Sequence, residues 1–174
     1  MKKIYALYDY KGFFGSKVAV PYRSGMNKVK LIEEFEELGY NLEFRAFFDI
    51  DFRKDSIKDE LFIYTSAEDN EFNYKSYIDD IVYGIEMAGG IVIPAYRFLK
   101  ANNNKITMEI IRDMMQFDRV KNIKSSYFGT LEDLQKIYNK ELNKELVIKL
   151  AEGASGRGVS KASNLSTLIH EVKK

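Results

Sequence analysis

Strand and helix patterns alternate along the first half of the chain, and this alternation limits the fold more than any other feature. Gly39 follows the first helical pattern and Gly89-Gly90 the second, and helix ends favour glycine. The run from Ile91 to Ile93 is continuously apolar, as in a parallel strand that is covered on both faces. A parallel α/β fold is therefore expected for residues 1–98. The strand patterns cover residues 4–10, 41–50, 61–65 and 91–94, and the helical patterns cover 26–38, with Ser24 as N-cap, and 73–88.

The organisation changes after residue 98. Asn102, Asn103 and Asn104 predict a helix start, and Thr130 predicts the start of a second helix. A last helix is expected from Ser163 or Asn164. The inner face expected for the first of these helices, over residues 105–116, consists of Ile106, Ile110, Ile111 and Met114. Short strands are expected at residues 122–129, 146–150 and 158–161.

Composition excludes several classes of function. The 27 Lys and Arg against 26 Asp and Glu give a net charge of +1 with no basic stripe, so no nucleic-acid partner is expected. The absence of cysteine excludes disulfides, thiolate zinc sites and a cysteine nucleophile, and the single histidine, His170, argues against a histidine metal site or a Ser-His-Asp triad. Neither a signal peptide nor a transmembrane span is evident, so a cytoplasmic location without a membrane partner is expected.

The strongest candidate for chemistry is the stretch from Glu145 to Lys161. Lys149 interrupts an apolar strand, and an ammonium in apolar surroundings needs an anionic partner. Flexible backbone that directs N–H groups at an anion, flanked by cations, is a common phosphate site. Two other interpretations stay open from the residues alone: Lys149 can face water on an edge strand, and the glycines can shape a hairpin turn. The glycines of the loop are Gly153, Gly156 and Gly158.

Residues 147–159 resemble the strand and glycine-rich loop of the ATP-grasp superfamily, with Leu150 where proline is common. Asn104-Lys105 resembles the start of the ATP-binding part of that family, and residues 122–134 resemble the stretch that follows it. The resemblance covers residues 94–174 by motif and the earlier residues by fold type only. It implies a Rossmann-like parallel α/β (pre-ATP-grasp) domain over residues 1–98. A partial ATP-grasp domain, the small α+β first subdomain, would follow over residues 99–174.

The resemblance also implies a function and a set of ATP-binding residues. The chain would be the N-terminal fragment of an ATP-dependent enzyme, most often in this family a carboxylate–amine ligase that acts through an acyl phosphate, and would be inactive alone. The magnesium ligands of the family come after the loop, so magnesium is expected only with a missing C-terminal half or a partner chain that supplies it. The alternatives are a non-catalytic nucleotide- or sugar-phosphate-binding module and an ATP-grasp phosphotransferase. The implied ATP-binding residues are Lys105, Lys149, Gly153, Ser155, Gly156, Arg157 and Gly158.

Two loops at the carboxyl ends of predicted strands are candidates for a small-molecule substrate site, because ligands of open α/β sheets bind at that edge. The first contains Gly12 and Gly15, and the second contains Thr65 and Ser66. Simple connections without a ligand are the alternative. The acidic pairs at residues 68–69 and 79–80 are expected to be solvated, and no metal ligand or catalytic residue is assigned. If a missing domain normally covers some of the many aromatic side chains, their exposure would favour self-association into a homo-oligomer.

Overall fold

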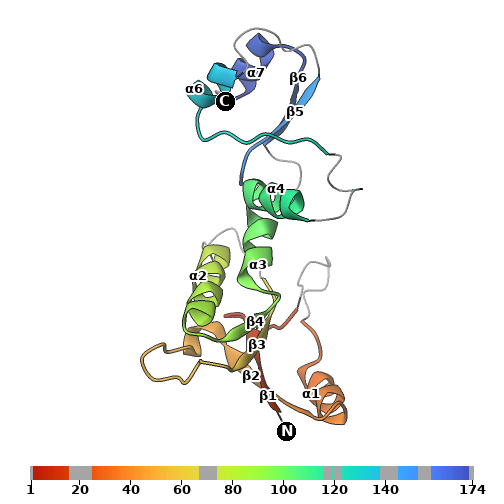
Figure 1. Cartoon of the computed structure of the whole chain (residues 1–174). Coiled ribbons are helices and arrows are strands. Elements are labelled where there is room, and N and C mark those ends of the chain that lie inside the picture. The colour runs from red at the N-terminus through yellow and green to blue at the C-terminus, as the bar shows by residue number, and fades with distance from the viewer. Residues whose placement is uncertain are drawn as a thin grey trace. The chain divides into compact units, whose positions relative to one another are not determined.

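The computed structural model describes residues 2–15, 25–66, 74–115, 119, 123–137, 145–152 and 158–172. The chain divides into two compact units, Met1–Leu99 and Lys100–Lys174, and each is described by itself (Figure 1). The sequence predicted a change of organisation between residues 98 and 99. None of the helices among the described residues combines the length and the apolar composition that a membrane crossing requires.

The first unit is built on a four-stranded parallel sheet, which confirms the expected α/β class (Figure 1). The strand order is β2-β1-β3-β4, so β1 lies between the second and third strands of the chain. Ile4 on β1 aligns with Leu42 on one side and with Leu61 on the other. The strands are β1 Lys2–Tyr8, β2 Tyr40–Ala46, β3 Leu61–Tyr64 and β4 Ile91–Ile93.

Two helices cover opposite faces of this sheet: α1 Lys28–Glu37 and α2 Tyr74–Met87 (Figure 1). The N-cap of α1 is Asn27, whose side chain accepts the Lys30 N–H at 3.2 Å, rather than Ser24, which lies outside the described residues. The core on the α1 face is formed by Ile4, Ala6, Phe14 and Leu42, and the core on the α2 face includes Leu7, Phe47, Phe62, Ile78, Val82 and Ile85.

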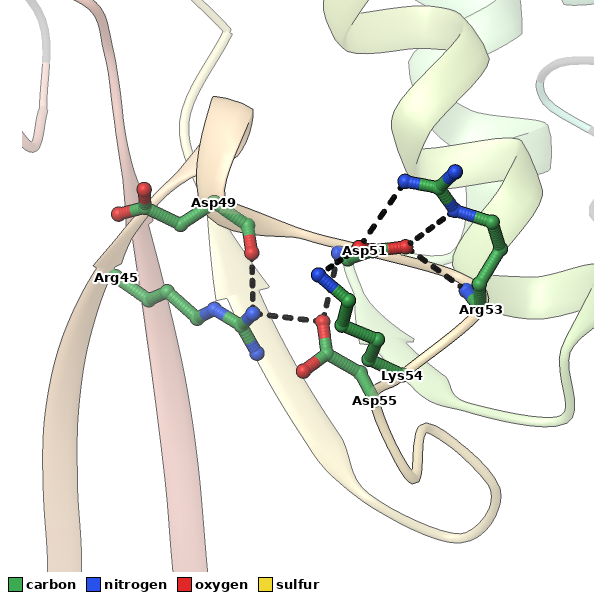
Figure 2. Close-up of polar contacts among 6 residues, drawn as sticks. All are labelled: Arg45, Asp49, Asp51, Arg53, Lys54 and Asp55. Carbon is green, nitrogen blue, oxygen red and sulfur yellow. Dashed lines mark hydrogen bonds and ion pairs between the residues drawn. The ribbon is translucent and has the colours of Figure 1, made fainter.

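The connection from β2 to β3 is held by polar contacts and contains no α-helix. Strand β2 ends at Ala46, four residues before the predicted end, because a short 3-10 helix, Phe47–Asp49, follows it. The Arg45 guanidinium donates to the Asp49 backbone oxygen and, at 2.6 Å, to Asp55 Oδ2 (Figure 2). The same Asp55 carboxylate accepts the Asp51 N–H at 2.7 Å. These bonds and the buried side chains of Phe47, Ile50 and Ile57 order the connection.

The second unit has a small core. Its elements surround three buried residues, Leu134, Ala162 and Leu168. Residues 123–129 form no strand, so that part of the predicted strand is wrong. The elements of this part of the chain are α3 Tyr96–Asn103, which spans the boundary between the units, α4 Lys105–Met114, α6 Leu131–Ile137, β5 Leu146–Lys149, β6 Val159–Ala162 and α7 Leu165–Val172.

The asparagine run and helix α4 differ from the prediction in two ways. Asn102 and Asn103 end α3, and only Asn104 caps α4, where its side chain accepts the Thr107 N–H at 3.1 Å. The predicted inner face of α4 is also wrong in part, because Ile110 is 39% and Met114 76% exposed, whereas Ile106 and Ile111 are half-buried. Glu109 is buried instead and forms an ion pair with Arg112. An ion pair lowers the cost of burying these charges, which a hydrophobic pattern does not detect.

We predict that Asp55→Asn lowers the free energy of unfolding at pH 7 by about 1 kcal/mol, the usual value of a partly exposed charged hydrogen bond. The Arg45 guanidinium holds the pKa of the Asp55 carboxyl below its ordinary value. This carboxyl therefore stabilises the fold above its unfolded pKa of about 3.9 and loses that effect as the pH falls through the lower folded pKa. The difference between the variant and the wild type should thus vanish in acid.

Urea unfolding followed by circular dichroism between pH 7 and pH 2 measures this difference. Asp59→Asn is the matched control, because Asp59 is exposed, lies in the same connection and has a φ of 65°, which asparagine tolerates. Equal stabilities of the two variants at pH 7 would show that the Arg45–Asp55 contact does not stabilise the connection.

Candidate functional site

The candidate ATP-binding residues that the structure describes are Lys105, Lys149 and Gly158. Lys149 lies on an antiparallel hairpin formed by β5 and β6, and the other two are hydrogen-bonded next to it. Leu146 aligns with Ala162 and Lys149 with Val159. One face of the hairpin packs Leu146, Ile148 and Ala162 into the small core. This confirms the predicted strand after the glycine loop and leaves the other face of the hairpin open.

The open face combines aliphatic and cationic side chains. Val147 is 57% and Val159 44% exposed, and Lys149 and Lys161 alternate with them across the two strands. Of the two interpretations of Lys149 that the residues left open, the structure confirms the one in which its side chain faces water on an edge strand, because the side chain is exposed on this face. The reason is that a two-stranded hairpin is covered on one side only. Lys149 beside two valines can bind a phosphate group and an apolar ring at the same surface, whereas the Lys161 ammonium is 3.3 Å from the Glu145 carboxylate.

The start of helix α4 is tied to the segment that follows β5. The Lys105 N–H donates to the Ala151 oxygen at 2.8 Å, and Ala151 is two residues from Lys149. The two predicted ATP-binding lysines therefore belong to segments that are joined by a backbone hydrogen bond. They are separated by more than forty residues of sequence, so this proximity is a result of the fold.

The last residue of the glycine loop, Gly158, lies beside the residue that follows β5. Leu150 N–H donates to the Gly158 oxygen at 2.8 Å, and Gly158 has a φ of +71°. A Cβ at Gly158 would lie 2.9 Å from Leu150 Cδ1, so both the backbone and the space require glycine. The other predicted loop residues, Gly153, Ser155, Gly156 and Arg157, lie outside the described residues.

In the first unit, the loops after β1 and β3 meet at the carboxyl edge of the sheet. The chain passes to β2 on one side of β1 and to β3 on the other, so the direction of winding reverses between β1 and β3. Open α/β sheets bind ligands at such a switch point. The loop after β1 is ordered by the buried Asp9 carboxylate, which accepts the N–H groups of Lys11 at 2.9 Å and Phe13 at 3.0 Å.

The structure brings the two predicted substrate loops together. The Gly15 N–H donates to Thr65 Oγ1 at 2.9 Å. The Ser66 hydroxyl oxygen is buried and has no hydrogen-bond partner among the described residues. Gly12 has a φ of +79° and open space where a Cβ would be, so its role is to allow the turn of the loop. Thr65 and Ser66 thus provide the side-chain hydroxyl groups at this edge.

A cation that sequence analysis missed lies at the same edge. Lys28 Nζ is 3.7 Å from the centroid of the Tyr8 ring and 5.2 Å from that of Phe44. Burial lowers the pKa of Lys28, and the negative charge of Asp9 acts in the opposite direction. The structure makes Lys28 the first residue of α1, where the helix dipole disfavours a cation, whereas the sequence pattern started this helix at residue 26.

On the other face of the edge, Tyr64 and Asp79 are buried and Tyr74 is half-buried. Tyr10 N–H donates to the Tyr74 hydroxyl at 3.0 Å, and burial raises the pKa of Tyr74 to about 12, so this phenol is neutral at physiological pH. Burial raises the pKa of Tyr64 as well, and the charges of Glu86 and Asp79 add to the effect. Asp79 is 9% exposed, so its predicted solvation is wrong, whereas Asp80 is exposed and Glu68 and Asp69 lie outside the described residues.

The described residues hold no group of three or more His, Cys, Asp or Glu side chains that could bind a metal ion. The described acidic residues of the candidate loops have other roles, as the Asp9 carboxylate shows by ordering the loop after β1. No metal ligand is therefore assigned in either unit.

No protein-family model, no curated protein and no solved structure matches the chain. The resemblance to the ATP-grasp superfamily consequently rests on the sequence motifs alone.

We predict that Gly158→Ala destabilises the hairpin. A residue other than glycine in the left-handed region costs about 1–2 kcal/mol, and the new Cβ would also press on the Leu150 side chain. The Leu150 N–H should then exchange with solvent about tenfold faster or more, the factor that corresponds to 1.4 kcal/mol. Amide hydrogen exchange by NMR measures this rate.

Gly129→Ala is the matched control, because the nearest atom to its added Cβ is 3.9 Å away and its φ is not positive. If Leu150 exchanged at the wild-type rate in Gly158→Ala, the bond to Gly158 would not close the base of the loop.

Proposed function

We propose that the chain is the N-terminal, ATP-binding part of an ATP-grasp enzyme, with a pre-ATP-grasp α/β domain followed by the first ATP-grasp subdomain. The observation that carries the proposal is the hydrogen bond between the Lys105 N–H and the Ala151 oxygen. It joins the two segments, the start of α4 and the end of β5, that the sequence motifs assign to ATP independently of each other. A chance similarity in two short motifs would not require them to be neighbours.

The open face of the hairpin supports the proposal by its chemistry. Val147 and Val159 offer an apolar surface to a purine ring, and Lys149 offers a charge to the phosphates. The loop that starts after Glu152 and ends at Gly158 is long enough to cover a phosphate chain with backbone N–H groups. Such a cover excludes water and stabilises the charge of a phosphoryl group during transfer.

The reaction that we propose is the ATP-dependent joining of a carboxylate and an amine through an acyl phosphate. The γ-phosphoryl group passes to a carboxylate oxygen with release of ADP, and the amine then displaces phosphate. The first ATP-grasp subdomain would bind and orient ATP, and we assign no metal ligand to this chain. A non-catalytic nucleotide-binding module is the second candidate, and it differs by binding ATP without turnover.

We predict that the chain binds ATP and that Lys149→Ala weakens this binding about tenfold or more, the loss of one charged contact. Isothermal titration calorimetry with ATP measures the affinity. In an assembly that turns over ATP, the same substitution should abolish the turnover, and near-normal activity would contradict the assignment.

Lys161→Ala is the matched control. Lys161 lies on the same face of the hairpin, but its ammonium is 3.3 Å from the Glu145 carboxylate and is thereby already paired. Its removal should change the affinity for ATP about twofold at most, within the range of an exposed ion pair. Equal losses in the two variants would indicate non-specific attraction of a polyanion, and the absence of ATP binding by the wild type would overturn the proposal.

A further inference from the structure

We propose that Lys28 and Thr65 bind a small oxyanion, a carboxylate or phosphate group, at the switch point between β1 and β3. The site consists of the Lys28 ammonium and the hydroxyl groups of Thr65 and Ser66, and we call it the switch-point site. It lies in the first unit and does not depend on ATP binding by the hairpin of the second unit.

In the described part of the chain, the Lys28 ammonium has no carboxylate partner. Among the described residues no carboxylate lies within ion-pair distance of it, and its contacts are the rings of Tyr8 and Phe44. A ring face attracts a cation by about 0.5–2 kcal/mol. However, an ammonium has three N–H donors, and a ring face can take only those that point toward it. The position of Lys28 at the first residue of α1 adds the unfavourable helix dipole. A bound anion would relieve both costs.

Two hydroxyl groups, those of the consecutive residues Thr65 and Ser66, are available as donors at this edge. Thr65 Oγ1 accepts the Gly15 N–H, which leaves its own O–H to donate. The Ser66 oxygen is buried without a partner among the described residues. A buried hydroxyl without a partner costs about 1–3 kcal/mol, so such groups are uncommon unless a ligand or water completes them.

The sheet register places Lys28 and Thr65 at one corner. Leu7 aligns with Tyr64, so the next positions along the two parallel strands are Tyr8 and Thr65. The side chains of Ala6 and Tyr8 on β1 belong to the α1 face, as does Ile63 on β3, and strand alternation puts Thr65 on that face too. The ring below Lys28 and the Thr65 hydroxyl therefore come from neighbouring positions at the carboxyl edge, about 5 Å apart in strand spacing.

The site can bind an anion although the Asp9 carboxylate, which would repel an anion, is nearby. The Asp9 carboxylate is 3% exposed and accepts the N–H groups of Lys11 and Phe13, so it faces the loop that it orders. The negative charge of Asp9 raises the pKa of Lys28 and so favours the charged ammonium. A cation and two hydroxyl donors at a sheet edge are suited to an oxyanion, because each of these groups can donate to an oxygen.

The test is an NMR titration of amide shifts at constant ionic strength. Sodium phosphate and sodium acetate are added in separate series, with sodium chloride as the reference. We expect saturable shifts at Gly15, Thr65 and Lys28 with one or both oxyanions, and the responsive anion identifies the group that the site binds. Lys28→Met and Thr65→Val should weaken the binding about tenfold or more, the loss of a charged hydrogen bond.

Lys30→Met is the matched control, since Lys30 is exposed on the same helix and contacts no aromatic ring in the described part of the chain. Lys30→Met and Lys28→Arg should keep the wild-type affinity within about threefold, because each of them retains a cation at position 28. Equal losses in Lys28→Met and Lys30→Met, or no saturable shift with either oxyanion, would overturn the proposal. If Lys28→Met were unfolded, Thr65→Val and Lys28→Arg would still decide the outcome.

The outcome is separable from that of the ATP proposal. Lys28→Met should bind ATP with wild-type affinity in the calorimetric titration, and Lys149→Ala should bind the oxyanion normally. A failure at the switch point therefore leaves the hairpin assignment standing, and the reverse also holds.

Discussion

The parallel pairing of β1 with strands on both sides is the constraint on which the first unit depends. Because β2 lies on one side of β1 and β3 on the other, the chain must cross the sheet in opposite directions. Right-handed crossovers then place α1 and α2 on opposite faces. No helix crosses between the carboxyl ends of β1 and β3, and so the Asp9 loop, Thr65 and Lys28 can meet there. The switch-point site is thus a consequence of strand order.

In each unit, one face of the β-sheet is less covered by other elements than the opposite face. On the first sheet, the α2 face also receives Phe47, Ile50 and Ile57 from the β2–β3 connection, whereas the α1 face has a single short helix, and Ile91 and Ile93 on that side are 47% and 52% exposed. The hairpin of the second unit likewise has one packed face and one open face. Exposed aliphatic groups of this kind mark ligand or partner surfaces, which agrees with the proposal that the chain works with further residues or a partner.

Sequence patterns predicted the elements better than the faces that they bury. The sheet and its helices were located by the helix-ending glycines, Gly39 and Gly89, and by the apolar strand patterns. These signals are local, so they can be recognised in the sequence without knowledge of tertiary contacts. The face of α4 was wrong in part, because Glu109 is buried and pairs with Arg112 one turn further along the same helix, and a hydrophobic pattern does not detect charges that are buried as a pair. Residues 123–129 of the strand expected at 122–129 form no strand, because a strand needs a partner strand and these residues have none in the described structure.

The two lysines that carry the proposals show what each kind of reasoning can find. Lys149 attracted attention because its neighbours are apolar, yet its side chain is exposed, and its candidacy now rests on the hydrogen bond that brings Lys105 to the same loop. Lys28 looked ordinary beside other charged residues, yet it is a partly desolvated cation at a helix N-terminus, against the helix dipole. A residue that violates a local rule is a reasonable candidate for function, because function can compensate the cost. The sequence directed attention to the hairpin by similarity and to Thr65 and Ser66 by topology, and the structure added Lys28 through an unmet physical requirement.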